Sequence, residues 1–231
     1  MAWQLALGLK TDDFPTFEAF VAGGNREAVT ILHDLVIAAR PGVAYIWGPA
    51  GSGKTHLLQA ACVGGPAAGI YLPLAELAHH GVGLLDGLES RTPLCLDDIG
   101  TVAGDGAWEE ALFHLFNRAQ SAGALVVMAG RSPPRGLGIR LPDLLSRLVG
   151  GLGIPLRAPT DEELVEILRA MTARRGMRVA DDVLGYLLSR ERRELGYLAM
   201  LVERLDRCSL ASQRRVTIPF IKEVLDASES S

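Results

Sequence analysis

The sequence predicts a parallel α/β domain followed by a smaller domain made only of helices. Three observations support this fold class. Apolar strand-like runs alternate with helix-like segments up to residue 158, as in parallel sheets that helices cover on both faces. A glycine-rich loop joins the first strand to the next helix, and from residue 159 onward only helical patterns follow. We therefore expect an N-terminal segment at 1–13, an α/β domain at 14–158 and a helical domain at 159–231.

Five parallel strands and their covering helices account for the α/β domain. A first helix is expected over 26–39, with Asn25 as its N-cap and Pro41-Gly42 after its end. The later helical segments are expected at 56–62, 75–78, 84–88 and 106–122, and one begins at Pro142. The strands are expected at 43–47, 69–73, 93–99, 124–129 and, as a short fifth, 154–156.

The helical domain begins with a clear start signal. The run Thr160-Asp161-Glu162-Glu163 has the form of a capping box, so a helix should begin there and continue to about Arg175. Further helices are expected over 180–189 and 194–210, and Pro219 opens a last helix that ends near Ala227.

Composition limits the function classes. The chain has 231 residues, 48% hydrophobic and 22% charged, and no apolar run of membrane length, which indicates a globular protein without a membrane partner. A net charge of −4 gives no general basic field for direct binding of nucleic acid. Cys62, Cys95 and Cys208 show neither metal-ligand nor disulfide spacing, so we expect a reducing, cytoplasmic location.

The loop after the first strand predicts a nucleotide site. It fits G-x-x-x-x-G-K-[ST], the phosphate-binding P-loop, and its residues are Gly48, Pro49, Ala50, Gly51, Ser52, Gly53, Lys54 and Thr55. In this motif backbone N–H groups surround the phosphates, Lys54 reaches the terminal phosphates and Thr55 holds Mg²⁺. The alternative is a glycine-rich turn that binds nothing, but the flanking strand and helix favour a site for ADP or ATP.

Three further residues could complete this chemistry. Asp97 ends an apolar strand, where a P-loop protein carries its second Mg²⁺ partner, and Asp98 could orient an attacking water. The alternative is that this acidic pair only ends a strand and begins a turn. Arg147, on a short helix after the fourth strand, could be an arginine finger acting on a nucleotide of a neighbouring subunit, or simply a solvated arginine.

Taken together, these residues resemble the AAA+ ATPases of the clade of the bacterial initiator DnaA. The segment 17–25 is similar to the one that precedes the DnaA nucleotide site, which implies that Phe20 and Val21, together with His56 after the P-loop, contribute to nucleotide binding. The run 94–99 is similar to the DnaA Walker B strand, and 141–148 to the segment that carries the family's arginine finger. The resemblance thus implies an AAA+ domain with a helical lid, and catalytic roles for Asp97, Asp98 and Arg147.

Within this clade the chain is most similar to the Hda family of regulatory inactivators. The runs 102–109 and 205–225 resemble Hda, and no DNA-binding helix-turn-helix is expected after the lid. Residues 4–9 resemble the Hda clamp-binding peptide, with Gln4, Leu5, Leu7 and Leu9 as its contacts. The resemblance implies binding to the DNA sliding clamp, contact with DNA only through the clamp, and stimulation of ATP hydrolysis by DnaA. ADP or ATP would hold the two domains of a monomer or homo-oligomer.

Three departures from the family pattern concern details of this expectation. Gly8 replaces the proline of the clamp motif, Arg131 takes the place of a polar or acidic sensor, and Gly196 stands where a lid arginine is expected, with Arg193 nearest to it. Weak hydrolysis by the chain itself is therefore expected.

Two other functions remain open at this stage. A helicase loader of the same clade would bind helicase and single-stranded DNA, and a pull-down with clamp or helicase separates it. A small-molecule P-loop kinase would need an acceptor site, and a phosphotransfer screen tests for it.

Overall fold

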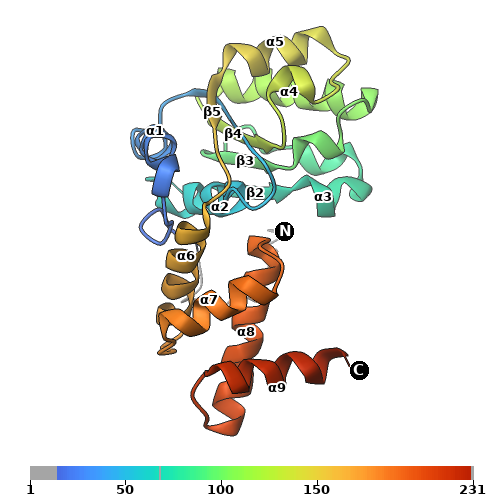
Figure 1. Cartoon of the computed structure of the whole chain (residues 1–231). Coiled ribbons are helices and arrows are strands. Elements are labelled where there is room, and N and C mark those ends of the chain that lie inside the picture. Colours follow the sequence, from blue (N-terminus) through green and yellow to red (C-terminus); the bar gives the residue numbers. More distant parts are fainter. Residues whose placement is uncertain (1–14, 68, 230–231) are drawn as a thin grey trace. The chain divides into compact units, whose positions relative to one another are not determined.

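The chain divides into two compact units, Met1–Ala158 and Pro159–Ser231 (Figure 1). The computed structural model describes residues 15–67 and 69–229, so residues 4–9 of the expected clamp-binding peptide lie outside the described residues. Within the described ranges no helix combines the length and the apolar character needed to cross a bilayer.

The first unit contains a parallel sheet of five strands, as the sequence predicts. Their order across the sheet is β2-β3-β4-β1-β5, so β1 lies between β4 and β5. All the strand pairs are parallel. The strands are β1 (Gly42–Trp47), β2 (Ile70–Pro73), β3 (Leu94–Asp97), β4 (Leu125–Gly130) and β5 (Leu152–Pro155).

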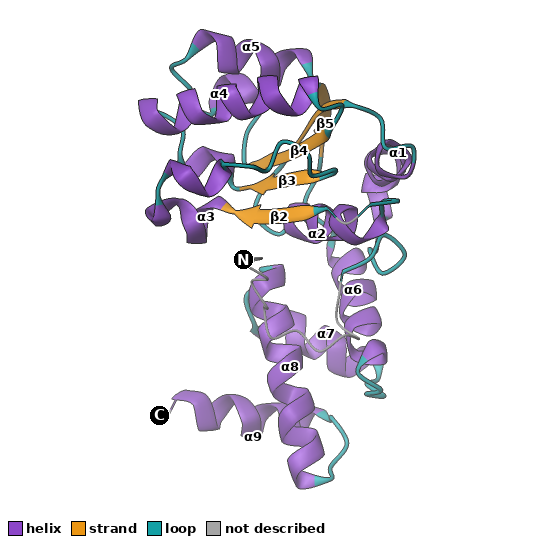
Figure 2. Ribbon diagram, turned by 180° about the vertical axis from the view of Figure 1, so that it is seen from behind, coloured by secondary structure: helices purple, strands orange, loops and turns teal. Residues whose placement is uncertain are grey.

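Helices cover both faces of this sheet (Figures 1 and 2). One face packs against α1 (Arg26–Ile37) and α2 (Lys54–Gly64), and the other against α4 (Gly106–Ser121) and α5 (Pro142–Gly150). Alternate side chains of β4 enter the two apolar clusters: Met128 packs in the cluster of Leu112, and Val127 in that of Leu58. Every residue of β4 is therefore buried, which explains its uninterrupted apolar sequence.

The elements between β2 and β3 are short. The helix α3 (Leu74–Leu77) follows β2 directly, and a 3₁₀ turn occupies Val82–Leu85, where the sequence predicts a helical piece at 84–88. These pieces pack through Leu74 and Leu85 against the same face as α4.

The prediction that the Asn25 side chain caps α1 is wrong. Asn25 stands at the N-cap position but makes no side-chain cap hydrogen bond, and α1 ends at Ile37. Its amide instead pairs with the backbone of Arg157 beyond β5, donating from Nδ2 to the carbonyl oxygen at 3.0 Å and accepting from the peptide N–H at 2.9 Å. Because Asn25 is only 9% exposed, both polar ends of its amide need protein partners, and the distant backbone supplies them.

The second unit is a helical domain with its own core. The capping box is confirmed: the Thr160 hydroxyl accepts from the Glu163 N–H at 3.3 Å, and the Glu163 carboxylate accepts from the Thr160 N–H at 2.9 Å. Leucine-rich faces of the helices meet in one apolar cluster that includes Leu168, Leu187 and Leu198. The helices are α6 (Asp161–Arg174), α7 (Asp181–Arg190), α8 (Leu195–Ser212) and α9 (Ile218–Glu229).

Candidate nucleotide site and arginine finger

The P-loop turns from the carboxyl end of β1 into α2. Gly51 and Gly53 have φ values of 74° and 90°, a left-handed region in which a side chain is strained. A Cβ at Gly53 would also lie 2.4 Å from the Phe20 ring, so this position needs glycine for two reasons. The loop directs the first turn of α2 toward the sheet edge, where helix N–H groups and the helix dipole favour bound phosphate.

Lys54 lies at the start of α2 and is only 8% exposed. Its ammonium donates to the carbonyl oxygens of Gly48 and Pro49, both at 2.8 Å, and to the Ser52 hydroxyl at 3.3 Å. Burial lowers the pKa of Lys54, while the charges of Asp97 and Asp98 oppose that shift. The geometry thus holds the cation within the loop itself, on the side that faces two carboxylates.

The end of β3 meets the start of α2 at a pair of oxygen groups. The Thr55 hydroxyl donates to Oδ2 of Asp97 at 2.7 Å, and Asp97 is only 3% exposed. The Tyr71 hydroxyl donates to the same oxygen at 2.9 Å, and burial raises the pKa of that phenol. Tyr71 is a site residue that the sequence analysis missed, because strand pairing between β2 and β3 brings it beside Asp97.

These oxygen groups fit Mg²⁺. The described residues contain no cluster of three or more His, Cys, Asp or Glu side chains that could hold a metal alone. Mg²⁺ is instead bound by one or two protein oxygens together with substrate phosphates and water. Thr55 and Asp97 would be those protein ligands, and the ion would neutralise charge on the phosphates.

Asp98 occupies a strained position directly after the strand. Its φ is 52°, in the left-handed region, and its peptide N–H donates to Oδ1 of Asp97 at 2.9 Å. Such a conformation is uncommon outside glycine and recurs at functional sites. The turn separates the two neighbouring carboxylates: Asp97 is buried, and Asp98 is only half-buried.

The segment before α1 lies against the P-loop. The Phe20 ring contacts Gly53, and it meets the His56 ring edge to face with 5.3 Å between the ring centres. Nε2 of His56 lies 2.9 Å from the carbonyl oxygen of Thr16, which makes this nitrogen the donor. The structure therefore brings Phe20 and His56 together with the P-loop, and Val21 follows Phe20 as a half-buried residue.

The two departures in the sensor positions have different surroundings. Arg131 follows β4 and is exposed, and its charge contributes to lowering the pKa of Lys54. Gly196 in α8 has no heavy atom within 4 Å of the place where a Cβ would lie. Arg193 pairs with Asp161 at 2.9 Å, so this guanidinium is engaged within the helical unit.

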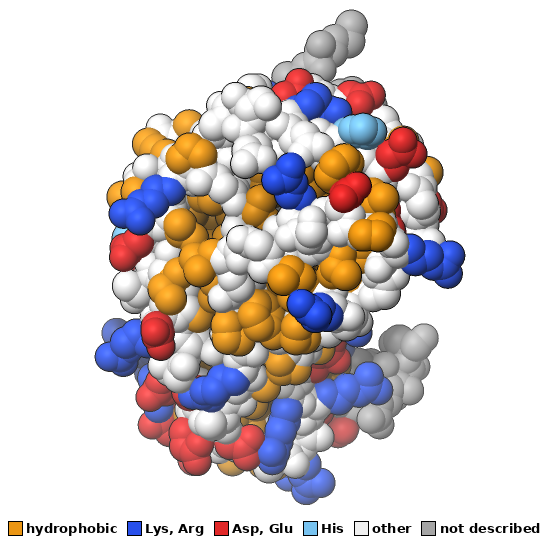
Figure 3. Space-filling model, turned by 90° about the horizontal axis from the view of Figure 1, so that it is seen from above, with side chains coloured by type: hydrophobic (Ala, Val, Ile, Leu, Met, Phe, Trp, Pro, Cys, Tyr) orange, Lys and Arg blue, Asp and Glu red, His pale blue; other side chains and the backbone are white. Residues whose placement is uncertain are grey.

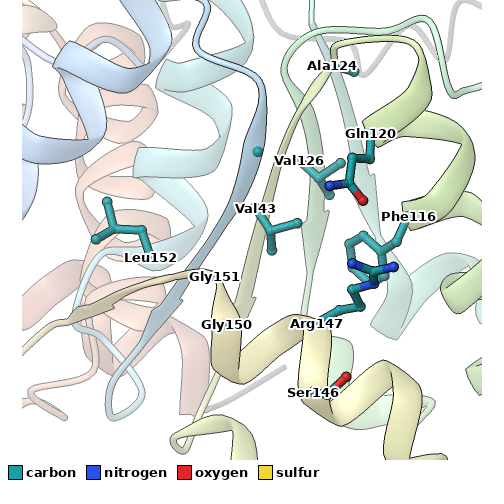
Figure 4. A pocket seen from close by; sticks show the side chains of 11 residues that line it. Val43, Phe116, Gln120, Ala124, Val126, Ser146, Arg147, Gly150, Gly151 and Leu152 are labelled. Carbon is teal, nitrogen blue, oxygen red and sulfur yellow. The ribbon is translucent and has the colours of Figure 1, made fainter.

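Arg147 lies near the amino end of β1, whereas the P-loop follows the carboxyl end of that strand. It is exposed, its Nη2 donates to Oδ1 of Asn117 at 3.1 Å, and it lines a cleft of about 430 Å³ (Figure 4). The cleft also involves Gly42 and Val43 at the amino end of β1. Six residues of strand separate the two ends of β1 by roughly 16–20 Å.

Exposed apolar residues follow Arg147 closely in the chain. Val149 and Leu152 expose 45% and 44% of their surface at the end of α5 and the start of β5. Figure 3 shows hydrophobic side chains gathered near the centre of one face of the molecule, with Lys, Arg, Asp and Glu side chains around them. Within the described part of the chain the hydrogen-bond partner of Arg147 is a neutral amide, which leaves its charge uncompensated there.

Solved structures share this fold. Domain III of the replication initiation protein DnaA from Thermotoga maritima matches with a TM-score of 0.80 and 24% identity, over 95% of this chain and 98% of that chain. AMPPCP-bound DnaA from Aquifex aeolicus matches with a TM-score of 0.70 and 22% identity, over 94% and 70% of the two chains. A RuvB variant from Thermotoga maritima matches with a TM-score of 0.68 and 20% identity, over 92% and 72%.

The parallel sheet, the glycine-rich loop after β1 and the helical second unit give this chain the same fold as domain III of DnaA and as RuvB. Residues 161–225, in the helical unit, match the family model of the lid domain of Hda. The chain is therefore similar to Hda in its helical unit and to domain III of DnaA in its fold.

Proposed function

We propose that this protein binds ADP or ATP with Mg²⁺, docks on the DNA sliding clamp and stimulates ATP hydrolysis by DnaA. In this proposal the chain's own nucleotide lies on the P-loop, with Lys54 at the terminal phosphates and Thr55 and Asp97 at the metal. The peptide 4–9 binds the clamp, which gives contact with DNA only through the clamp. Hydrolysis of the ATP on DnaA then prevents re-initiation of replication.

The position of Arg147 carries the proposal. An arginine at the amino edge of the sheet is too far from the chain's own P-loop to touch a phosphate held there. Its exposed guanidinium, held by the neutral amide of Asn117, is available to a nucleotide on another AAA+ subunit. Charge that develops on the transferring phosphoryl oxygens is then stabilised by a permanently charged, planar donor.

The residues at the sensor positions favour ATP hydrolysis on DnaA over hydrolysis on this chain. Arg131 and Gly196 replace the residues expected of an active ATPase, and Arg193 is paired with Asp161. We therefore expect slow hydrolysis at the chain's own P-loop, where Asp97 and Asp98 still allow binding of Mg²⁺. Nucleotide there acts mainly to hold the protein in a state competent for DnaA.

The direct test is hydrolysis of ATP bound to DnaA, measured with this protein in the presence and absence of DNA-loaded clamp. Stimulation that requires both the protein and the loaded clamp supports the proposal. Absence of stimulation under all conditions contradicts it, and a pull-down that captures replicative helicase but no clamp favours a helicase loader.

A further inference from the structure

Glu109 is a buried carboxylate that accepts hydrogen bonds from the backbone of two segments, one just before α4 and one about 30 residues further along the chain. It lies in the first turn of α4 and is only 2% exposed. Its Oε1 accepts from the peptide N–H of Gly104 at 2.7 Å, and its Oε2 from that of Leu141 at 2.7 Å. The N–H of Arg140 donates to both oxygens at 3.0 Å. One peptide group that precedes α4 in the chain and two that follow it thus donate to the same side chain.

One segment adjoins the candidate Mg²⁺ ligands at the end of β3, and the other adjoins the helix of the candidate arginine finger. Gly104, with φ of 86°, lies in the turn that continues from Asp98 through the 3₁₀ helix Ile99–Thr101. Leu141 is the N-cap of α5, the helix that carries Arg147. Glu109 therefore joins the turn after the Walker B strand to the entry of the arginine helix.

A second contact ties the same two helices together further along. Asn117 of α4 holds the guanidinium of Arg147 of α5 at 3.1 Å. On α4 the two contact residues are eight positions apart, about 12 Å along the axis, and on α5 Leu141 and Arg147 are six positions apart, about 9 Å. The contact nearer the start of α4 is also the one nearer the start of α5. The helix α4 therefore holds α5 at two places, near its start and at Arg147.

Glu109 is ionised, which suits it to accept these hydrogen bonds. Burial alone would raise the pKa of the carboxyl, but the hydrogen bonds from Arg140, Gly104 and Leu141, together with the Arg140 charge, outweigh burial and lower it. The group is therefore ionised at neutral pH and presents only acceptors to the N–H donors. An anion at the start of α5 also complements the dipole of that helix.

We propose that Glu109 is a positioning residue that fixes the entry of α5, and through it Arg147, relative to the turn after the Walker B strand. This inference rests on the proposed function, since it assigns Glu109 to the finger on α5. Glu109 itself touches no reacting group. Its signal in the sequence is a carboxylate among the buried positions of an otherwise apolar helix face, beside Trp108 and Leu112.

The test compares Glu109→Gln with Glu110→Gln in the full-length protein. The glutamine amide keeps one acceptor oxygen and turns an N–H₂ group toward the remaining N–H donors, so the bonds to Gly104 and to Leu141 cannot both be kept. Glu110 is the adjacent carboxylate on the same helix, with 73% of its side chain exposed, and its replacement should leave every readout at the wild-type level. Stimulation of DnaA hydrolysis should fall about 10–100-fold in Glu109→Gln, as expected of a misplaced catalytic group.

Two readouts separate positioning from a general loss of structure. Amide hydrogen exchange in Glu109→Gln should accelerate in peptides covering 138–148 and stay unchanged in those covering the P-loop, 48–58, and ADP should bind with wild-type affinity.

The outcomes distinguish this inference from the proposed function. If Arg147→Ala abolishes stimulation but Glu109→Gln does not lower it, the inference is overturned and the proposed function stands. If Arg147→Ala has no effect, the proposed function fails. Equal acceleration of exchange in 138–148 and 48–58 reduces Glu109 to a structural residue. If Glu109→Gln does not fold, Glu109→Asp, which keeps the charge on a shorter stem, is judged by the same criteria.

Discussion

The hydroxyl of Thr55 donates to Oδ2 of Asp97 at 2.7 Å, and this bond joins the start of α2 to the end of β3. Residues 42 positions apart in the chain thus present two oxygen groups at the same edge of the sheet as the P-loop. We propose that this pair is the protein part of a Mg²⁺ site, with phosphate and water as the other ligands.

Removal of the Asp97 charge should therefore remove the effect of Mg²⁺ on nucleotide binding. In wild-type protein, ADP with Mg²⁺ should raise the melting temperature more than ADP with a chelator does. In Asp97→Asn the two values should become equal, because the amide is neutral and a poor Mg²⁺ ligand. The control Asp86→Asn, at an exposed position, should retain the difference; a retained difference in Asp97→Asn would remove Asp97 from the site.

Nucleotide binding should depend on Lys54. A ligand at about 100 times its dissociation constant stabilises a folded protein by about 2.7 kcal/mol. For a chain of this size that corresponds to a rise of about 5–11 °C in melting temperature. Lys54→Ala removes the charge that we expect beside the phosphates, so the rise in melting temperature with ADP should be clearly smaller in this variant. Equal shifts in the two proteins would show that the P-loop is not the nucleotide site.

Clamp binding should depend on residues 4–9. In an extended peptide alternate leucines would share one side, and in an apolar groove the burial of each leucine would contribute roughly 1.5–3 kcal/mol. Replacement of Leu7 and Leu9 by alanine should raise the dissociation constant for the clamp at least tenfold and leave the melting temperature unchanged. The dissociation constant is measured by titrating the protein over surface-immobilised clamp. If a chain lacking residues 1–12 binds clamp as well as the full chain does, the binding site lies elsewhere.

Asn25 should contribute to the stability of the first unit. Its replacement by alanine leaves the N–H and the carbonyl of Arg157 without the two bonds that the amide supplies. The expected loss in the free energy of unfolding is about 1–3 kcal/mol, measured by urea denaturation. Ser121→Ala removes an exposed hydroxyl contact on α4 and serves as control, with a loss below about 0.5 kcal/mol. A loss that small in Asn25→Ala would contradict the bridge.

Local patterns in the sequence predicted the fold well. The P-loop and the capping box of Thr160 and Glu163 are formed within a few residues, so their partners can be read directly from the chain. The apolar run of β3 likewise indicated a strand buried on both faces, which the two clusters confirm.

Contacts between distant residues could not be predicted in the same way. Asn25 has the composition of a helix cap, yet its amide serves a backbone group 132 positions away. The carboxylate of Glu109 bonds to peptides 31 and 32 positions away, and Tyr71 reaches Asp97 only through the pairing of β2 with β3. Such partners depend on strand order and helix packing, which periodicity alone does not specify.

The central claim is that Arg147 acts on the nucleotide of DnaA, and its most direct test is the rate of DnaA-bound ATP hydrolysis with loaded clamp. Arginine fingers supplied in trans contribute about 10³–10⁵ in rate, so Arg147→Ala should abolish stimulation while ADP binding, clamp binding and melting temperature stay at wild-type values. Arg147→Lys should restore little, since an ammonium cannot reproduce the planar fork, and the exposed control Arg135→Ala should stimulate normally. Normal stimulation by Arg147→Ala would contradict the account.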